Sequence, residues 1–178
     1  LEANVFVCDL TNAEELSLKV GEAVTALGGG LDVLIDVGPL QSWASGQLSS
    51  GFGSGVLRFL AVFEQVLGPM CDNGGGSIVV VVPHGDNVIA GAEKGSMLGL
   101  VRSLAVEYAP KGIRVNCVCP GLIESSGDVS EDRLERIPMK RPASVKDLAG
   151  AIAFLASDAS SYITGIALGL DGGATGNV

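Results

Sequence analysis

The sequence predicts an α/β fold, a Rossmann-like doubly wound parallel sheet with helices on both faces. Strand-like and helix-like segments alternate along the chain, and the strand-like segments are apolar along their whole length. Such strands are buried on both faces, as in a parallel sheet between two layers of helices. The third observation is that 26 glycines are scattered through 178 residues, well above the ~7% typical share. This composition favours many tight turns between strands and helices.

The first part of the chain predicts two strands and two helices. Residues 4–10 (NVFVCDL) form a β-rich run, and 12–29 carries apolar residues at helical spacing until a run of glycines ends the helix. Residues 31–39 (LDVLIDVGP) are a nearly continuous apolar strand, and 56–70 predicts a helix that is apolar on most sides. The glycine- and serine-rich stretch 40–55 between them favours a loop.

The second part predicts three strands and two helices within the same domain. Ser144, with Asp147 three residues later, is typical of a capping box at the start of a helix. The polar stretch 125–142 indicates a loop, and no internal repeat or linker divides the chain, so we expect a single domain over 1–178. The strands are expected at residues 77–82, 112–121 and 163–173, and the helices at 95–112 and 144–158.

Composition and charge exclude several classes of function. A net charge of −9 and a pI near 4.4 disfavour nucleic acids and anionic membranes as partners. The longest apolar runs fall far short of the ~18 residues that a membrane span needs. A single histidine argues against a Cys/His zinc site, so no metal is expected. The four cysteines fit buried, reduced thiols in a cytoplasmic protein.

Several motifs occur in an order that is specific when they are taken together. They are CDL after a strand, LDVLI, GGGSIV, EKG, VRSLAVEYAPKGIRVNCVCPGLIES, RIPMKRPASVKDLAGAIAFLASDASSYITG and LDGG, and they cover nearly all of the chain. With these motifs the sequence resembles the short-chain dehydrogenase/reductase family. The resemblance implies a Rossmann-like domain, a nicotinamide cofactor and oxidoreductase chemistry.

The resemblance also implies a catalytic group of Asn, Ser, Tyr and Lys, of which the chain keeps one member. In the family, a tyrosine exchanges a proton with the substrate, a lysine lowers the tyrosine pKa, and a serine hydrogen-bonds the substrate oxygen. Lys94 matches the lysine, but Ala90 stands at the tyrosine position, Pro83 near the serine and Gly55 near the asparagine. We therefore expect no catalytic residue of the family's kind. His84 is the best candidate for a relocated acid.

The cofactor-binding side is also incomplete by this comparison. The family opens with a strand, a glycine-rich turn and a helix that bind the cofactor pyrophosphate, and nothing before residues 4–10 matches that unit. Pro39 replaces a glycine of the family's strand-four motif. We therefore expect a domain without this first βαβ unit, which binds no cofactor itself while a partner subunit holds NAD. The vestigial cofactor positions are Asp9, Leu10, Lys94, Pro120, Gly121 and Ser125.

The regions that would contact other subunits keep their apolar pattern. In the resembling family, helices matching 56–70 and 95–109 and the strand matching 163–173 form subunit contacts. The sequence therefore predicts a non-catalytic pseudoenzyme subunit that forms a heterotetramer with a catalytic paralogue. That complex would be an NAD-dependent secondary-alcohol dehydrogenase, acting for example on a hydroxyacyl-CoA of anaerobic toluene degradation through benzylsuccinate.

Two other functions remain open from the sequence. One is an active NAD(P)-dependent oxidoreductase with a relocated proton donor, which turnover by the pure chain would support. The other is a homo-oligomeric protein that binds a ligand in the former substrate cleft, which a bound small molecule would support.

Overall fold

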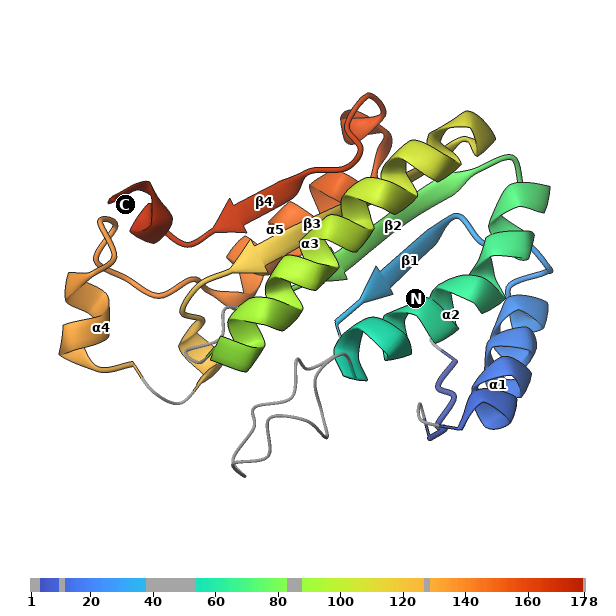
Figure 1. Cartoon of the computed structure of the whole chain (residues 1–178), viewed down its shortest axis with the longest axis horizontal. Coiled ribbons are helices and arrows are strands. Elements are labelled where there is room, and N and C mark those ends of the chain that lie inside the picture. The colour runs from blue at the N-terminus through green and yellow to red at the C-terminus, as the bar shows by residue number, and fades with distance from the viewer. Residues whose placement is uncertain (1–3, 10–11, 38–53, 83–87, 127–128, 178) are drawn as a thin grey trace.

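The predicted α/β class is confirmed by a four-stranded parallel sheet in the order β1-β2-β3-β4 (Figure 1). The computed structural model describes residues 4–9, 12–37, 54–82, 88–126 and 129–177. The register aligns Val33 with Ser77 and Ser77 with Arg114, so the strands end along one edge. The strands are β1 (Val33–Asp36), β2 (Gly76–Val81), β3 (Ile113–Pro120) and β4 (Ala167–Leu170).

Helices cover both faces of the sheet, as a doubly wound fold requires. Helices α2 and α3 lie across one face, α5 lies on the other, and α1 packs against α2 beside β1 (Figure 1). None of the helices in the described ranges combines the length and apolarity that a bilayer crossing demands. The helices are α1 (Ala13–Ala26), α2 (Ser54–Asp72), α3 (Val88–Tyr108), α4 (Glu131–Glu135) and α5 (Val145–Ala156).

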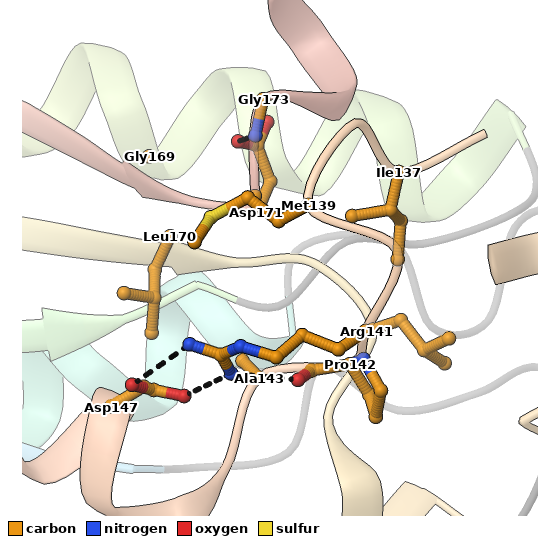
Figure 2. A pocket seen from close by; sticks show the side chains of 12 residues that line it. Ile137, Met139, Arg141, Pro142, Ala143, Asp147, Gly169, Leu170, Asp171 and Gly173 are labelled. Carbon is orange, nitrogen blue, oxygen red and sulfur yellow. Dashed lines mark hydrogen bonds and ion pairs between the residues drawn. The ribbon is translucent and has the colours of Figure 1, made fainter. Parts of the chain in front are cut away.

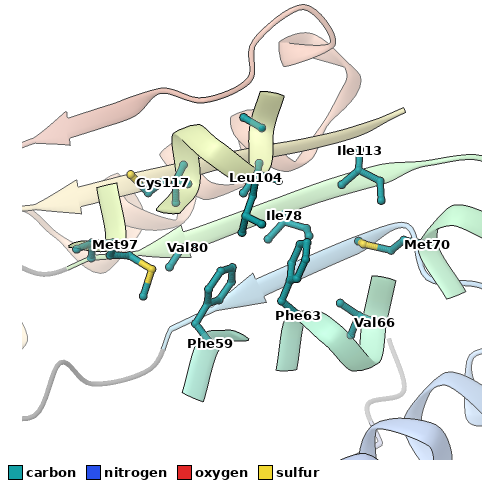
Figure 3. Close-up of a cluster of buried hydrophobic side chains, with 14 of the residues drawn as sticks. Phe59, Phe63, Val66, Met70, Ile78, Val80, Met97, Leu104, Ile113 and Cys117 are labelled. Carbon is teal, nitrogen blue, oxygen red and sulfur yellow. The ribbon is translucent and has the colours of Figure 1, made fainter. Parts of the chain in front are cut away.

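The main core lies between the sheet and helices α2 and α3. Phe59 and Phe63 of α2 and Met97 of α3 converge on Ile78 and Val80 of β2 (Figure 3). A smaller core on the α5 side contains Val79, Val118 and Leu155. Because successive side chains of β2 enter opposite cores, residues 78–81 of this strand are all apolar.

Local signals in the sequence set the helix ends. The Asn12 side chain accepts hydrogen bonds from the backbone N–H groups of Glu14 and Glu15, both at 3.2 Å, and caps α1. The predicted capping box of α5 is confirmed, because Ser144 and Asp147 each accept a hydrogen bond from the other's backbone N–H.

Three segments differ from the sequence-based expectation. Residues 4–9 form no strand and do not pair with β1, the edge of the described sheet that they could have extended. Helix α3 begins at Val88, seven residues before the expected start at 95, and so includes Ala90 and Lys94. The predicted loop 125–142 contains the short helix α4.

Candidate functional site

The carboxyl ends of the four strands form the edge where parallel α/β sheets bind ligands. Asp36 ends β1, Pro120 ends β3 and Asp171 follows β4 along this edge. Helix α3 follows β2 and therefore begins here, and α2 begins here too because its Arg58 reaches Asp36. Residues distant in sequence thus meet at one edge.

The first two turns of α3 carry the family's lysine position. Ala90 and Lys94 are four residues apart and share one face of the helix. Ala90 is buried, with 7% of its surface exposed, and its neighbour Glu93 is fully buried. Lys94 is half-buried. The alanine methyl has no proton to exchange, so the family's acid is not supplied from this position.

Two thiols of β3 lie close to Lys94. Cys117 and Cys119 are two residues apart and point to the same face of the strand, toward α3. The pKa of Cys119 is lowered to about 7, first because its thiolate accepts a hydrogen bond from Cys117 and then because Lys94 is positively charged, although burial opposes the shift. The same hydrogen bond and burial raise the pKa of Cys117. At neutral pH Cys119 can therefore exist as thiol or thiolate.

The S–H of Cys117 donates to the Ile166 carbonyl oxygen, which lies 3.6 Å from its sulfur. Of the two thiols, Cys119 lies nearer the carboxyl end of the strand.

A buried ion pair lies at the end of β1. The Arg58 guanidinium donates two hydrogen bonds to the Asp36 carboxylate, with Nη1–Oδ1 and Nη2–Oδ2 distances of 2.6 and 2.8 Å. The side chains of Arg58 and Asp36 are only 16% and 8% exposed. The remaining donor, Arg58 Nε, is buried and meets no acceptor among the residues that the structure describes.

The other predicted positions are dispersed. Gly55 is buried in the first turn of α2, while Asp9 and Ser125 are exposed. Gly121 follows β3 so closely against β4 that a Cβ there would lie 3.1 Å from the Asp171 Cβ. Leu10, Pro83 and His84 lie outside the described residues.

A cavity of about 400 Å³ lies beside the same edge, between β4 and the loop that precedes α5. The Arg141–Asp147 ion pair, with an Nη1–Oδ2 distance of 2.7 Å, forms one wall, and Leu170 and Met139 lie nearby (Figure 2). This pocket, the Asp36–Arg58 pair and the electrostatic influence of Lys94 on the two thiols could not be predicted from the sequence motifs. Arginine in the apolar pattern of 56–70 was the available signal for the buried pair.

Comparison with known proteins identifies the family. Residues 58–175 match the family model for Enoyl-(Acyl carrier protein) reductase. The chain is 34% identical to glucose 1-dehydrogenase of Gluconobacter oxydans, over 94% of this chain and 70% of that protein. It is 31% identical to human dehydrogenase/reductase SDR family member 4, over 94% of this chain and 67% of that protein. The chain belongs to the short-chain dehydrogenase/reductase family, a family of oxidoreductases.

Solved structures share the fold and carry cofactors. A gluconate 5-dehydrogenase from Burkholderia cenocepacia in complex with NADP and tartrate matches 97% of this chain and 75% of its own, with a TM-score of 0.86 and 25% identity. An NAD+-bound xylitol dehydrogenase matches 94% of this chain and 78% of its own, with a TM-score of 0.82 and 26% identity. The expectation that this chain binds no cofactor is contradicted by these nucleotide-bound neighbours.

Proposed function

We propose that the chain binds a nicotinamide dinucleotide and interconverts a secondary alcohol and a ketone, using a proton donor other than tyrosine. The observation that carries this proposal is the position of Cys119, a thiol near the carboxyl end of β3 whose side chain faces α3, the helix that carries Lys94. Its lowered pKa agrees with this role. A general acid works best when its pKa lies close to the working pH.

The residues at the carboxyl edge fit such a cofactor. Arg58 Nε is a buried donor without an acceptor among the described residues, and an oxygen of a bound nucleotide would remove the cost of leaving it unpaired. Lys94 would donate to a ribose hydroxyl, as its position in the family implies. Nucleotide-bound neighbours of the same fold support this assignment.

The proton transfer is assigned to the thiol. During carbonyl reduction the S–H bond of Cys119 breaks as the O–H bond of the alcohol forms, and Lys94 and Cys117 stabilise the thiolate that remains. A reduced nicotinamide cofactor, held beside Lys94, would supply the hydride that the carbonyl carbon accepts. In the reverse direction the thiolate accepts the alcohol proton. Reduction therefore needs Cys119 protonated, and its rate should fall as pH rises through about 7, whereas oxidation should accelerate.

Two substitutions test the proposal. Cys119→Ala should lower the rate of ketone reduction by about 10²–10⁴-fold, the usual contribution of a general acid, and abolish the pH dependence near neutrality. Cys71→Ala, which replaces a half-buried thiol on α2, should leave both unchanged. Thiolate absorbance at 240 nm can be followed as pH is varied without cofactor. A titration midpoint near neutral pH should be present in the unchanged protein and in Cys71→Ala, and absent in Cys119→Ala. Unchanged turnover in Cys119→Ala would show that another group donates the proton.

The second candidate function is a catalytically silent subunit of a heteromeric dehydrogenase. Ala90, buried at the family's tyrosine position, is the observation that favours it. This candidate predicts that NADH fluorescence changes on binding, whereas the pure chain turns over no ketone until a catalytic paralogue is added. A hydroxyacyl-CoA would then be the partner's substrate.

A further inference from the structure

The pocket between β4 and the loop before α5 is open beside a glycine that lines it. A Cβ built on Gly169 meets no atom within 4 Å, so the missing side chain leaves open space. Gly172, with φ +61°, closes the same pocket tightly, since a Cβ there would lie 2.7 Å from Ile137 Cγ2. The volume of about 400 Å³ lies within the range of small-molecule sites, roughly 300–1,000 Å³.

Charged groups in the pocket wall are already paired with the protein. Arg141 donates from Nη1 to Asp147 Oδ2 at 2.7 Å and to the Pro142 carbonyl at 3.1 Å. Asp147 also accepts from the Ser144 N–H and hydroxyl, at 2.8 and 2.9 Å. These bonds, with that of Arg141 the strongest, hold the pKa of Asp147 well below its usual range. Asp147 is therefore a carboxylate at neutral pH.

A second carboxylate makes the pocket net negative. Asp171 Oδ2 accepts from the Thr175 hydroxyl at 2.5 Å and from the Thr175 N–H at 2.9 Å, and Oδ1 accepts from the Gly173 N–H at 3.0 Å. These bonds lower the pKa of Asp171. One guanidinium thus faces two carboxylates among the lining residues. A carboxylate or phosphate ligand would be repelled, while an uncharged group meets no such cost.

The remaining wall is apolar. Hydrocarbon surface comes from Ile137, Met139 and Leu170 (Figure 2). Leu122 also lines the pocket. Leu122 lies three residues beyond Cys119 in the chain, just after β3 ends at Pro120. The pocket is therefore next to the edge at which the proton donor is proposed. A substrate with a compact apolar group could place that group in the pocket and its carbonyl at the proposed proton donor.

We infer that this pocket binds the uncharged, apolar part of a small ketone or secondary-alcohol substrate, such as one aromatic ring, and rejects anions of the same size. That the ligand is the substrate rests on the proposed function, whereas the binding itself does not. The two can therefore fail separately.

Fluorine NMR of the full chain without cofactor tests the binding. The probes are 4-fluoroacetophenone and 4-fluorobenzoate, which share a fluorinated ring and differ in charge. The ketone should bind at least tenfold more tightly than the carboxylate. Gly169→Val should fill the pocket and weaken ketone binding at least tenfold. Ala167 lies two residues earlier on the same face of β4 and outside the pocket lining. Ala167→Val should therefore change the affinity for the ketone less than twofold.

The inference would be overturned if the two probes bound with equal affinity. It would also be overturned if Gly169→Val and Ala167→Val lost the same affinity for the ketone. If Gly169→Val does not fold, Met139→Trp fills the pocket from the exposed loop and should weaken ketone binding similarly. Binding of the ketone by a chain that never turns it over would leave the pocket assignment in place and reject the proposed activity. Turnover of a ketone by a chain whose pocket binds no probe would reject the pocket assignment and leave the proposed activity in place.

Discussion

Asp36 and Arg58 show how much one pair of residues can determine at the sheet edge. They are 22 residues apart and form two short hydrogen bonds in a nearly buried position. Each charge is tolerated there because the other is present, since an unpaired buried charge loses its hydration without compensation. The pair also fixes the direction of Arg58 Nε, the donor that we assign to the cofactor.

Removal of only one partner should be costly. Arg58→Met leaves the Asp36 carboxylate buried without a partner and should lower the free energy of unfolding by about 3–5 kcal/mol. The double variant Asp36→Leu/Arg58→Met removes both charges and should recover most of that loss. Urea denaturation of the three proteins measures the difference. A double variant less stable than Arg58→Met would show that the pair itself is net stabilising.

At the level of single residues, the sequence predicts positions that belong to a motif. It does not predict interactions between residues that are distant in the chain. Lys94 and Ala90 could be assigned because the family spacing places them four residues apart on one helix. Cys119 could be predicted as a buried thiol but not as a titrating group, because its lowered pKa depends first on a hydrogen bond from Cys117 and then on the charge of Lys94, two interactions that only the folded structure defines. The expected absence of a catalytic residue stays a prediction.

Helix α3 illustrates the same limit for a whole element. Its start was predicted seven residues late, because Gly91 weakens the helical pattern ahead of residue 95. Gly91, Gly95 and Gly99 recur every fourth residue, and a Cβ at each of them meets nothing within 4 Å. The residues 4–9 are the opposite case, in which a good strand pattern lacks a neighbouring strand.

Replacing each of two glycines by alanine should change the free energy of unfolding in opposite directions. Gly99→Ala should raise the free energy of unfolding by about 0.5–1 kcal/mol, because the site is helical and open. Gly75→Ala should lower it by at least about 1–3 kcal/mol, the cost of a strained backbone. Gly75 has φ +123°, and a Cβ there would lie 2.5 Å from the Gly112 carbonyl oxygen. Thermal and urea denaturation measure both changes. A destabilised Gly99→Ala would indicate that another surface packs against that helix face.

At the scale of the whole molecule, apolar side chains are exposed on α2 and α3, the helices for which the sequence predicts subunit contacts. Leu57 of α2 and Val106 of α3 are 67% and 79% exposed, and β4 is a free edge of the described sheet. A subunit contact over these two helices would bury such side chains. The large negative net charge opposes contact between identical chains, so a partner with complementary charge would associate more readily. Heterotetramer formation with a paralogue is therefore retained as a prediction.

Native mass spectrometry of the untagged protein from its own host should identify that association. We expect a complex with a second, larger chain. Val106→Glu should dissociate the complex, because a charge buried at the contact would have no partner. Leu18→Glu, at an exposed position of α1, should leave it intact and serves as the control. A homo-oligomer would instead support the ligand-binding alternative. If neither variant changes the mass, the contact does not use the α3 surface, and β4 becomes the surface to substitute next.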